Sequence, residues 1–393
     1  MVERNIPMFT KLTSLALILL PFCVWPGYDT REPKLFMALV ISLVLGLFSF
    51  YKGYFKPYKN IWFMLFLFYI PLNYLLTPKL NLLIFGLPLG AFWIIQSYLI
   101  ILIFFIAHVA INSYQFTDED KTRILKIMVW VGTIMSIYAI FQRLGFDQYW
   151  ITRNPGDIEG QVAGTLGNRV ILAPFLAMIV PLALYLKKYI QAILLILVVF
   201  MCQSAVACGA LIISLLFLLA TKSKRFLILA ISLFIIISLI LTIGYFKSPK
   251  IKSLMGNNYR FLAWKTIIND VKEPKEITKD KKQRYPLTGF GLGAFRYIFQ
   301  TEHKSMLPGY REAHNDYLEL LYNTGLIGLG LFLMGLYFLT KQFFPLDRLN
   351  ANLFASFICI AICAGGIFVW QQGCHIFYTL VIVGLLNKRG EVE

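Results

Sequence analysis

The residues best suited to chemistry lie within 310–319, a polar segment in an otherwise strongly apolar chain. His314 stands where this segment runs into an apolar helix, with Leu318 and Leu321 following at helical spacing. A helix N-terminus offers free N–H donors and a positive dipole end, which suit a phosphate and disfavour an imidazolium. A neutral His314 could therefore take a proton as a general base, although a capping or structural histidine fits the same position.

The segment before His314 is strongly basic. Residues 247–313 carry 14 Lys and Arg against six Asp and Glu. Either this loop handles an anionic substrate, or it is a solvated loop whose charge has no specific role. Its part 271–284 is rich in Lys and Glu, which predicts a mobile, solvated insert without chemistry.

Residues 259–271 have the spacing of an amphipathic helix, which we expect to lie on the membrane surface. Arg260 and Lys265 stand on its polar flank. Its apolar side is predicted to consist of Phe261, Trp264, Ile267 and Ile268.

Three alternating glycines, Gly289, Gly291 and Gly293, lie between that helix and His314. They permit tight turns and let backbone N–H groups approach a ligand closely. No strand–turn–helix unit surrounds them and no Gly-Lys-Ser/Thr follows, which excludes a dinucleotide fingerprint and a P-loop. Close helix packing explains three further glycines in the apolar helix that follows, Gly325, Gly328 and Gly330.

The acidic clusters favour structural roles. Asp118, Glu119 and Asp120 resemble a D-x-D metal motif, but they begin a helix, where acidic residues are favoured. Asp29 and Glu32 lie in 27–34, the first loop predicted to face outward, and could ligate a metal, but solvation in the loop and pairing with Arg31 or Lys34 is the favoured interpretation.

The remaining histidines and the cysteines show no ligand pattern. His108 and His375 lie inside apolar segments, which predicts packing against, or bonding to, neighbouring helices, and nothing around His303 suggests a role. The six cysteines show neither C-x-x-C nor His/Cys ligand spacing and are expected to pack as small apolar residues. We therefore predict no metal site and no cofactor.

These side chains must be positioned by membrane helices. Of 393 residues, 58% are hydrophobic and 15% are charged, unlike a soluble domain. Recurring apolar segments of membrane-spanning length predict an all-α polytopic membrane protein with about twelve transmembrane helices in a single integral domain, 1–393. The predicted spans are 12–26, 35–51, 60–76, 92–111, 123–144, 168–186, 189–204, 207–221, 225–246, 316–340, 350–368 and 373–387.

Basic clusters in alternate connections predict the orientation. They fall on the cytoplasmic side if both termini are cytoplasmic. One large extracytoplasmic loop, 247–315, then separates spans nine and ten. The clusters are Lys52, Lys56 and Lys59; Lys121 and Arg123; Lys187 and Lys188; Lys222, Lys224 and Arg225; Lys341 and Arg348; and Lys388 and Arg389.

Several motifs follow one another in an informative order. Arg260 and Trp264 precede the glycine motif, which runs from Pro286 to Phe295. His314-Asn315-Asp316-Tyr317-Leu318-Glu319 and Gly325-x-x-Gly328 come next, and 164–168, Gly-Thr-Leu-Gly-Asn, opens span six. With the twelve-span layout, this order resembles the O-antigen ligase/polymerase superfamily over essentially the whole chain.

The resemblance implies a GT-C-like glycosyltransferase of the bacterial inner membrane. Its donor would be a glycan on undecaprenyl diphosphate at the outer face. The acceptor would be lipid A-core in a ligase, which is the favoured type, another lipid-linked repeat in a polymerase, or a protein hydroxyl in an oligosaccharyltransferase. Membrane lipids are implied partners, and nucleic acid is not.

The resemblance also implies roles for individual residues. His314 and Arg260 correspond to the family's catalytic histidine and loop arginine. Cationic groups on the diphosphate would come from Arg311, Lys265 and Arg169. The loop and motif would be supported by Asn315, Gly289, Gly291 and Gly293, and the reaction needs neither a nucleotide nor a metal.

Two positions depart from the family pattern. The arginine that usually follows the serine before span eight is missing, because Ala205 follows Ser204, so Arg169 or Arg143 takes its place or the activity is altered. Arg169 could equally snorkel at the outer end of its span. A transporter of the lipid-linked precursor is the alternative from another class, but it would want charged residues along several spans, which are scarce here.

Overall fold

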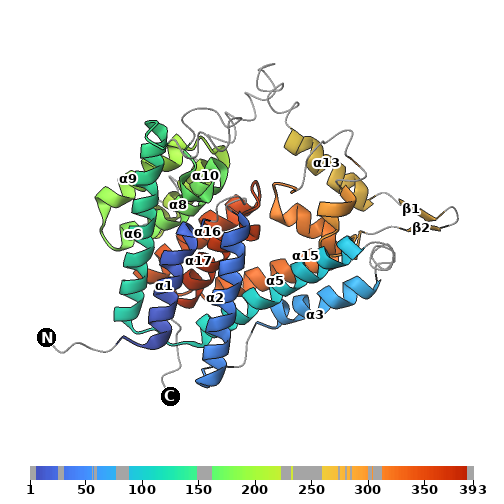
Figure 1. Cartoon of the computed structure of the whole chain (residues 1–393), viewed down its shortest axis with the longest axis horizontal. Helices are drawn as coiled ribbons and strands as arrows, with labels where there is room; N and C mark the ends of the chain where they lie inside the picture. The colour runs from blue at the N-terminus through green and yellow to red at the C-terminus, as the bar shows by residue number, and fades with distance from the viewer. Residues whose placement is uncertain are drawn as a thin grey trace.

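The computed structural model describes residues 6–24, 31–54, 56, 60–76, 88–147, 162–222, 232, 259–272, 275–278, 281–283, 286–299, 303 and 312–386. Apart from one short hairpin, the elements in these ranges are helices (Figure 1). The α-helices are α1 (Met8–Phe22), α2 (Arg31–Tyr51), α3 (Ile61–Leu76), α5 (Pro88–Ser113), α6 (Asp118–Arg143), α8 (Arg169–Tyr185), α9 (Tyr189–Met201), α10 (Ala205–Ala220), α13 (Tyr259–Lys272), α15 (Asp316–Lys341), α16 (Arg348–Ala364) and α17 (Gly373–Gly384). The short helical turns are η1 (Gly164–Leu166), η2 (Phe295–Phe299) and η3 (Val369–Gln371).

The helices have the character of membrane helices. By length and composition, three can cross a membrane: Glu32–Tyr51, Asp118–Arg143 and Asp316–Lys341. The other predicted spans within the described ranges coincide with shorter apolar helices, and 189–204 and 207–221 are two helices, α9 and α10. These helices indicate a multi-pass membrane protein. The predicted span 225–246 lies outside the described residues, apart from residue 232.

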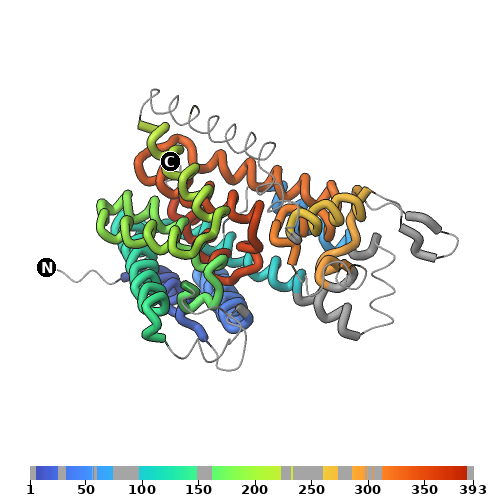
Figure 2. The backbone as a smooth tube through the Cα atoms, turned by 90° about the horizontal axis from the view of Figure 1, so that it is seen from above, coloured from blue at the N-terminus to red at the C-terminus, as the bar shows by residue number. Residues whose placement is uncertain are grey.

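The main core forms around α8. Every residue from 171 to 183 is buried, because this helix is apolar around its whole circumference. It packs against α6, α9, α10 and α16, with α1 and α17 completing the same core (Figures 1 and 2). The start of α8, where Arg169 stands, is therefore held by several helices at once.

The helices alternate in direction, so their connections gather at two opposite ends. At one end Phe9 of α1 stacks on Tyr114 of the α5–α6 connection, with ring centroids 4.4 Å apart. At the other end the Thr165 hydroxyl donates to the Pro21 carbonyl at 2.6 Å. The chain order then places the basic connections at the first end and the candidate residues at the second. The basic residues at the first end are Lys52, Lys56, Lys121, Arg123, Lys187, Lys188, Lys222, Lys341 and Arg348.

A second, smaller core lies beside the first. It joins α13, the glycine-containing loop 286–295 and the first half of α15, with Phe290, Phe295 and Tyr322 buried at its centre. In Figure 1 these elements lie on the right, with α3 and α5 below α15. This small core positions the loop that was predicted to carry the chemistry.

The helix predicted at 259–271 is present as α13, and its apolar side chains divide between a buried and an exposed set. Ala263, Ile267 and Val271 are buried against the smaller core, whereas Phe261 and Ile268 are 41% and 36% exposed. The small side chain of Ala263 lets α13 approach its neighbours closely, and this contact selects a face that hydropathy alone does not indicate.

The insert predicted at 271–284 contains regular structure. It forms a two-stranded antiparallel hairpin, β1 (Lys275–Thr278) and β2 (Lys281–Gln283), in which Lys275 pairs with Gln283. These two strands were not predicted, and the mobility and solvation of the insert stay a prediction. Ile277 is the one apolar residue in these two strands, so neither strand shows the alternation of apolar and polar residues that indicates a half-buried strand.

Candidate functional site

The start of α15 fixes the backbone around His314. Asn315 is the N-cap, and its Oδ1 accepts hydrogen bonds from the N–H groups of Tyr317 and Leu318, each at 3.1 Å. His314 precedes this cap with a φ of 50°, a left-handed conformation that is uncommon for a residue with a side chain. The cap and this turn fix the backbone from which the His314 ring projects.

The residue before His314 is held on both sides. The Trp264 indole N–H, on α13, donates to the Ala313 carbonyl at 2.8 Å, and the Ala313 N–H donates to Glu319 Oε2 at 3.0 Å. These bonds tie α13 to the start of α15. They place Arg260, one helical turn before Trp264, on the same side of the molecule as His314.

The surroundings of His314 keep its imidazole neutral. Burial and, to a smaller extent, the positive charge of Arg260 lower the pKa of His314 to about 4, and the Glu312 carboxylate opposes this shift. The Phe368 ring lies edge-on to the imidazole, with centroids 5.0 Å apart. At neutral pH His314 is therefore able to accept a proton.

The connection between α16 and α17, residues 365–372, forms a wall of this site that the sequence analysis did not identify. Arg260 Nη1 donates to the Gly366 carbonyl at 3.4 Å, and Asn315 Nδ2 donates to the Gly365 carbonyl at 2.9 Å. These carbonyls end α16, where the helix dipole is negative and favours a guanidinium. Arg260 and the cap of α15 are thus held by two adjacent residues.

Asp316 fixes the same connection from the other side. Its carboxylate accepts hydrogen bonds from the Trp370 N–H at 2.9 Å and from Gln371 Nε2 at 3.3 Å. Span eleven was predicted to continue to residue 368, but α16 ends at Ala364. The Gly365-Gly366 pair is the helix-end signal that could have revealed this wall.

The glycine loop closes a break in α15. Gly325 has φ 67° and ψ −169°, so the helical hydrogen bonds stop there and resume afterwards. The loop supplies the missing partners in both directions. Its N–H groups at Phe290 and Gly291 donate to carbonyls of α15, and its carbonyls at Pro286 and Leu287 accept from α15. The four pairs are Phe290–Tyr322 at 2.9 Å, Gly291–Asn323 at 2.7 Å, Leu326–Pro286 at 2.9 Å and Ile327–Leu287 at 3.1 Å.

Helix α3 secures the same break. The Tyr69 hydroxyl donates to the Thr324 carbonyl at 3.0 Å, and Asn73 Nδ2 donates to the carbonyl of Thr288 in the loop. The Asn323 side chain accepts from the Phe295 N–H at 2.9 Å. Three loop N–H groups that could have met a ligand, those of Phe290, Gly291 and Phe295, are therefore bound to α15, and the loop supports this helix.

The glycines have different roles from those predicted. At Gly289, which has a φ of 67°, an added Cβ would lie 2.5 Å from the Gly325 nitrogen, so this contact requires glycine on both sides. The helix-packing interpretation is wrong for Gly325, which breaks the helix, and for Gly330, around which there is open space. It holds for Gly328, where a Cβ would approach the Tyr69 ring at 3.1 Å. Gly291 and Gly293 also have positive φ values.

Arg169 begins α8 and points toward the α9–α10 turn. Asn168 caps the helix by accepting from the Val170 N–H at 2.8 Å, and Arg169 Nη1 donates to Gln203 Oε1 at 3.4 Å. Three residues after Gln203, the Val206 side chain packs against Gly366, whose carbonyl holds Arg260. Arg169 thus lies on elements that adjoin the same connection.

Lys265 and Arg311 were also predicted to bind the diphosphate. Lys265 is exposed. It follows Arg260 by five positions and therefore lies about 140° away from it around α13. Arg311 lies outside the described residues.

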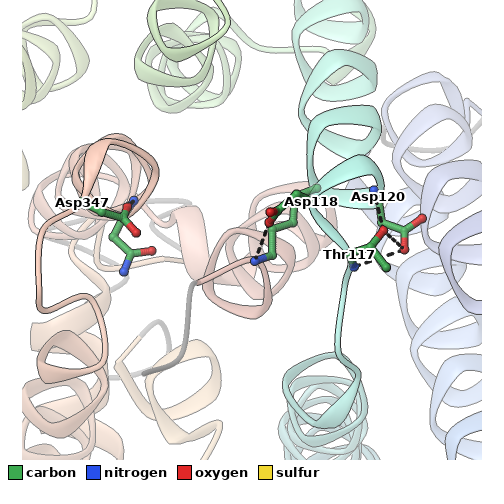
Figure 3. Close-up of polar contacts among 6 residues, drawn as sticks. Thr117, Asp118, Asp120 and Asp347 are labelled. Carbon is green, nitrogen blue, oxygen red and sulfur yellow. Dashed lines mark hydrogen bonds and ion pairs between the residues drawn. The ribbon is translucent and has the colours of Figure 1, made fainter. Parts of the chain in front are cut away.

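The acidic residues at the start of α6 have the predicted structural role (Figure 3). Asp120 Oδ2 accepts from the hydroxyl and the N–H of Thr117 at 2.9 and 3.3 Å, and the Asp120 N–H donates back to the Thr117 hydroxyl at 3.2 Å. Asp118 pairs with Lys121 at 3.6 Å. Asp347 caps α16 in a similar way, accepting from the Asn350 N–H at 2.7 Å. Asp29 lies outside the described residues, and Glu32 is exposed in the first turn of α2.

The other histidines bond to neighbours. His375 Nε2 lies 3.0 Å from the Ile171 carbonyl on α8, and His108 packs edge-on against Phe63 on α3, as predicted. His303 was assigned no role, but its Nε2 lies 2.8 Å from Asp270 Oδ2 on α13. This pair ties the chain after η2 to α13, and no spacing in the sequence reveals it.

Comparison with protein-family models and with curated proteins finds no match to this chain.

Proposed function

We propose that this chain transfers a glycan from a lipid diphosphate to an acceptor hydroxyl, as the O-antigen ligase/polymerase superfamily does. The proposal rests on one observation: a histidine that stays neutral lies beside an arginine, and one connection holds both. It includes a GT-C-like arrangement of twelve spans, with cytoplasmic termini and the loop 247–315 at the outer face of a bacterial inner membrane.

The chemistry needs two groups. The acceptor hydroxyl oxygen attacks the anomeric carbon while the bond from that carbon to the phosphate oxygen breaks, and the diphosphate leaves with the bonding electrons. His314, whose imidazole is unprotonated at neutral pH, takes the hydroxyl proton as the new bond forms. The Arg260 guanidinium stabilises the charge that develops on the leaving diphosphate.

The electrostatics of this end support an anionic substrate. The helices α8, α10, α15 and α17 all begin here, so the positive ends of their dipoles share one side of the molecule. Arg169 and Arg260 add full charges, and residues 247–313 are rich in basic side chains. This concentration favours a diphosphate over a neutral ligand.

The decisive experiment incubates purified protein with a lipid-linked glycan and candidate acceptors. We expect wild type to transfer the glycan, and His314→Ala and Arg260→Ala to abolish transfer while inserting and expressing normally. Lys272→Ala, a change to an exposed cation on the helix that carries Arg260, is the matched control and should retain activity.

The product identifies the type of enzyme. A single glycan on lipid A-core indicates the favoured ligase, and a ladder of repeats on the lipid carrier indicates a polymerase. A glycosylated protein indicates an oligosaccharyltransferase. Full transfer by both His314→Ala and Arg260→Ala would refute the proposal.

A further inference from the structure

A polar network at the end of α6 holds the turn that leads into Arg169. Gln142 is only 5% exposed, and its Oε1 accepts from the Ala163 N–H at 3.1 Å and the Gly164 N–H at 2.7 Å. Its Nε2 donates to Asp147 Oδ2 at 3.1 Å and to the Gly164 carbonyl at 3.4 Å. One amide side chain therefore satisfies both sides of this turn.

The Asp147 carboxylate orients that amide. The oxygen that accepts from Gln142 also accepts from the Tyr138 hydroxyl, one helical turn earlier on α6. A carboxylate only accepts, so it forces Gln142 to present Nε2 to Asp147 and Oε1 to the turn. Reversing the amide would place two acceptors together and leave two buried N–H groups unpaired.

Residues at the ends of α1 and α9 also bond to the turn 162–168. Thr165 donates to Pro21 at the end of α1, and the Cys202 thiol lies 3.8 Å from the Val162 carbonyl. Gly164 has a φ of 58°, and Arg169 follows it by five residues. The position of Arg169 is thus determined by the turn as well as by α8.

We propose that Gln142 and Asp147 are positioning residues that hold Arg169 at the outer end of the bundle, toward Gln203. They act through the backbone of 162–168 and need not touch substrate. The inference deepens the proposed function and rests on it for the identity of the ligand, because Arg169 would then meet the diphosphate.

An exchange of functional groups tests this arrangement. Gln142→Glu keeps an acceptor for the turn but sets a carboxylate against Asp147. Asp147→Asn in the same chain restores a donor to that contact with the direction reversed. We expect Gln142→Glu to lower kcat/KM for the lipid-linked glycan by up to about 100-fold, as misplacement of a binding group does, and the double variant to recover most of it.

Two readouts separate positioning from general stability. In an Arg169→Ala background, Gln142→Glu should cause little further loss, because residues that act through one group are not additive. The modification rate of Arg169 by phenylglyoxal, followed by mass spectrometry, should rise in Gln142→Glu and return in the double variant. If Gln142→Glu fails to fold, Tyr138→Phe, which removes one donor to Asp147, should give a smaller rise.

Equal losses from Gln142→Glu with and without Arg169, or an unchanged modification rate in a folded variant, would overturn the inference. Wild-type transfer by Arg169→Ala, together with the expected change in modification rate, would support the positioning and reject the diphosphate role of Arg169. The positioning and the proposed function therefore fail in different ways.

Discussion

The residues around His314 determine both its backbone conformation and its charge state. Its backbone is set by the Asn315 cap and the two bonds to Ala313, and its charge state is set by burial and Arg260. An exposed histidine titrates near pH 6.5, so half of it would be protonated there and unable to act as a base. A buried histidine beside a cation keeps its base form over a wider range of pH.

We expect the transfer rate to reflect this lowered pKa. The neutral form is the base, so kcat/KM should stay level from neutral pH to about pH 5 and fall as pH approaches the pKa of about 4. A pH profile of initial rates measures this. A fall centred near pH 6.5, with the protein still folded, would contradict the lowered pKa of His314, and a rate that did not fall as the pH passed about 4 would contradict its assignment as base.

The effect of Arg260 on the pKa of His314 can be measured without an assay of glycan transfer. Arg260→Gln removes a positive charge that disfavours imidazolium, so the pKa of His314 should rise while burial still holds it below the ordinary value. Histidine NMR of selectively labelled protein follows this titration directly. Lys272→Gln, at an exposed position on the same helix, should leave the His314 titration in place.

At the scale of elements, α15 is two helical segments joined at Gly325 and completed by the glycine loop. We expect Gly325→Ala to be severely destabilising, because its Cβ would lie 2.2 Å from the Leu287 carbonyl oxygen. Its backbone conformation, with φ 67° and ψ −169°, is essentially restricted to glycine and adds about 1–3 kcal/mol. Gly330→Ala, in open space on the same helix, should be neutral or stabilising by up to about 1 kcal/mol.

Thermal unfolding of the two variants in detergent, followed by circular dichroism, makes this comparison. If Gly325→Ala unfolds at the same temperature as Gly330→Ala and wild type, the loop does not constrain the break in α15.

The sequence predicted elements better than their contacts. The apolar segments predicted the helices, because length and hydropathy are local properties of the sequence. The break at Gly325 was hidden, since a lone glycine in an apolar run is equally consistent with packing. The burial of Ala263 and Val271 on α13 was not predicted, and the predicted end of span eleven at residue 368 was wrong, because both depend on partners distant in sequence. Asn315 and the acidic start of α6 were correct because capping is local.

The candidate site was predictable only in part, for the same reason. His314 and Arg260 were chosen from their positions and from a resemblance, but the wall formed by 365–372 joins them through carbonyl groups that carry no side-chain signal. Gln142 was not singled out in the sequence. Its partners lie 21 and 22 residues away along the chain.

At the scale of the whole molecule, the basic connections lie at one end of the bundle and the candidate site lies at the other. This arrangement predicts which end faces each side of the membrane. In a chain without its six native cysteines, we expect Asn168→Cys to react with a membrane-impermeant maleimide added from outside, and Lys188→Cys to be protected. Both positions are exposed, at opposite ends of α8, so access alone separates them. The reverse pattern would invert the topology and place His314 inside the cell.

The interrupted α15 also has a consequence for how the protein is made. Backbone N–H and C=O groups without hydrogen-bond partners are costly in hydrocarbon. Neither segment of α15 is therefore stable in the bilayer until the loop 286–295 has bonded to it. Translation delivers the loop first, and on the proposed topology it is already across the membrane when α15 emerges from the ribosome. Synthesis order therefore supplies the partner before the helix that requires it. A permuted gene encoding the loop after α15 would lose this advantage and should yield little inserted protein.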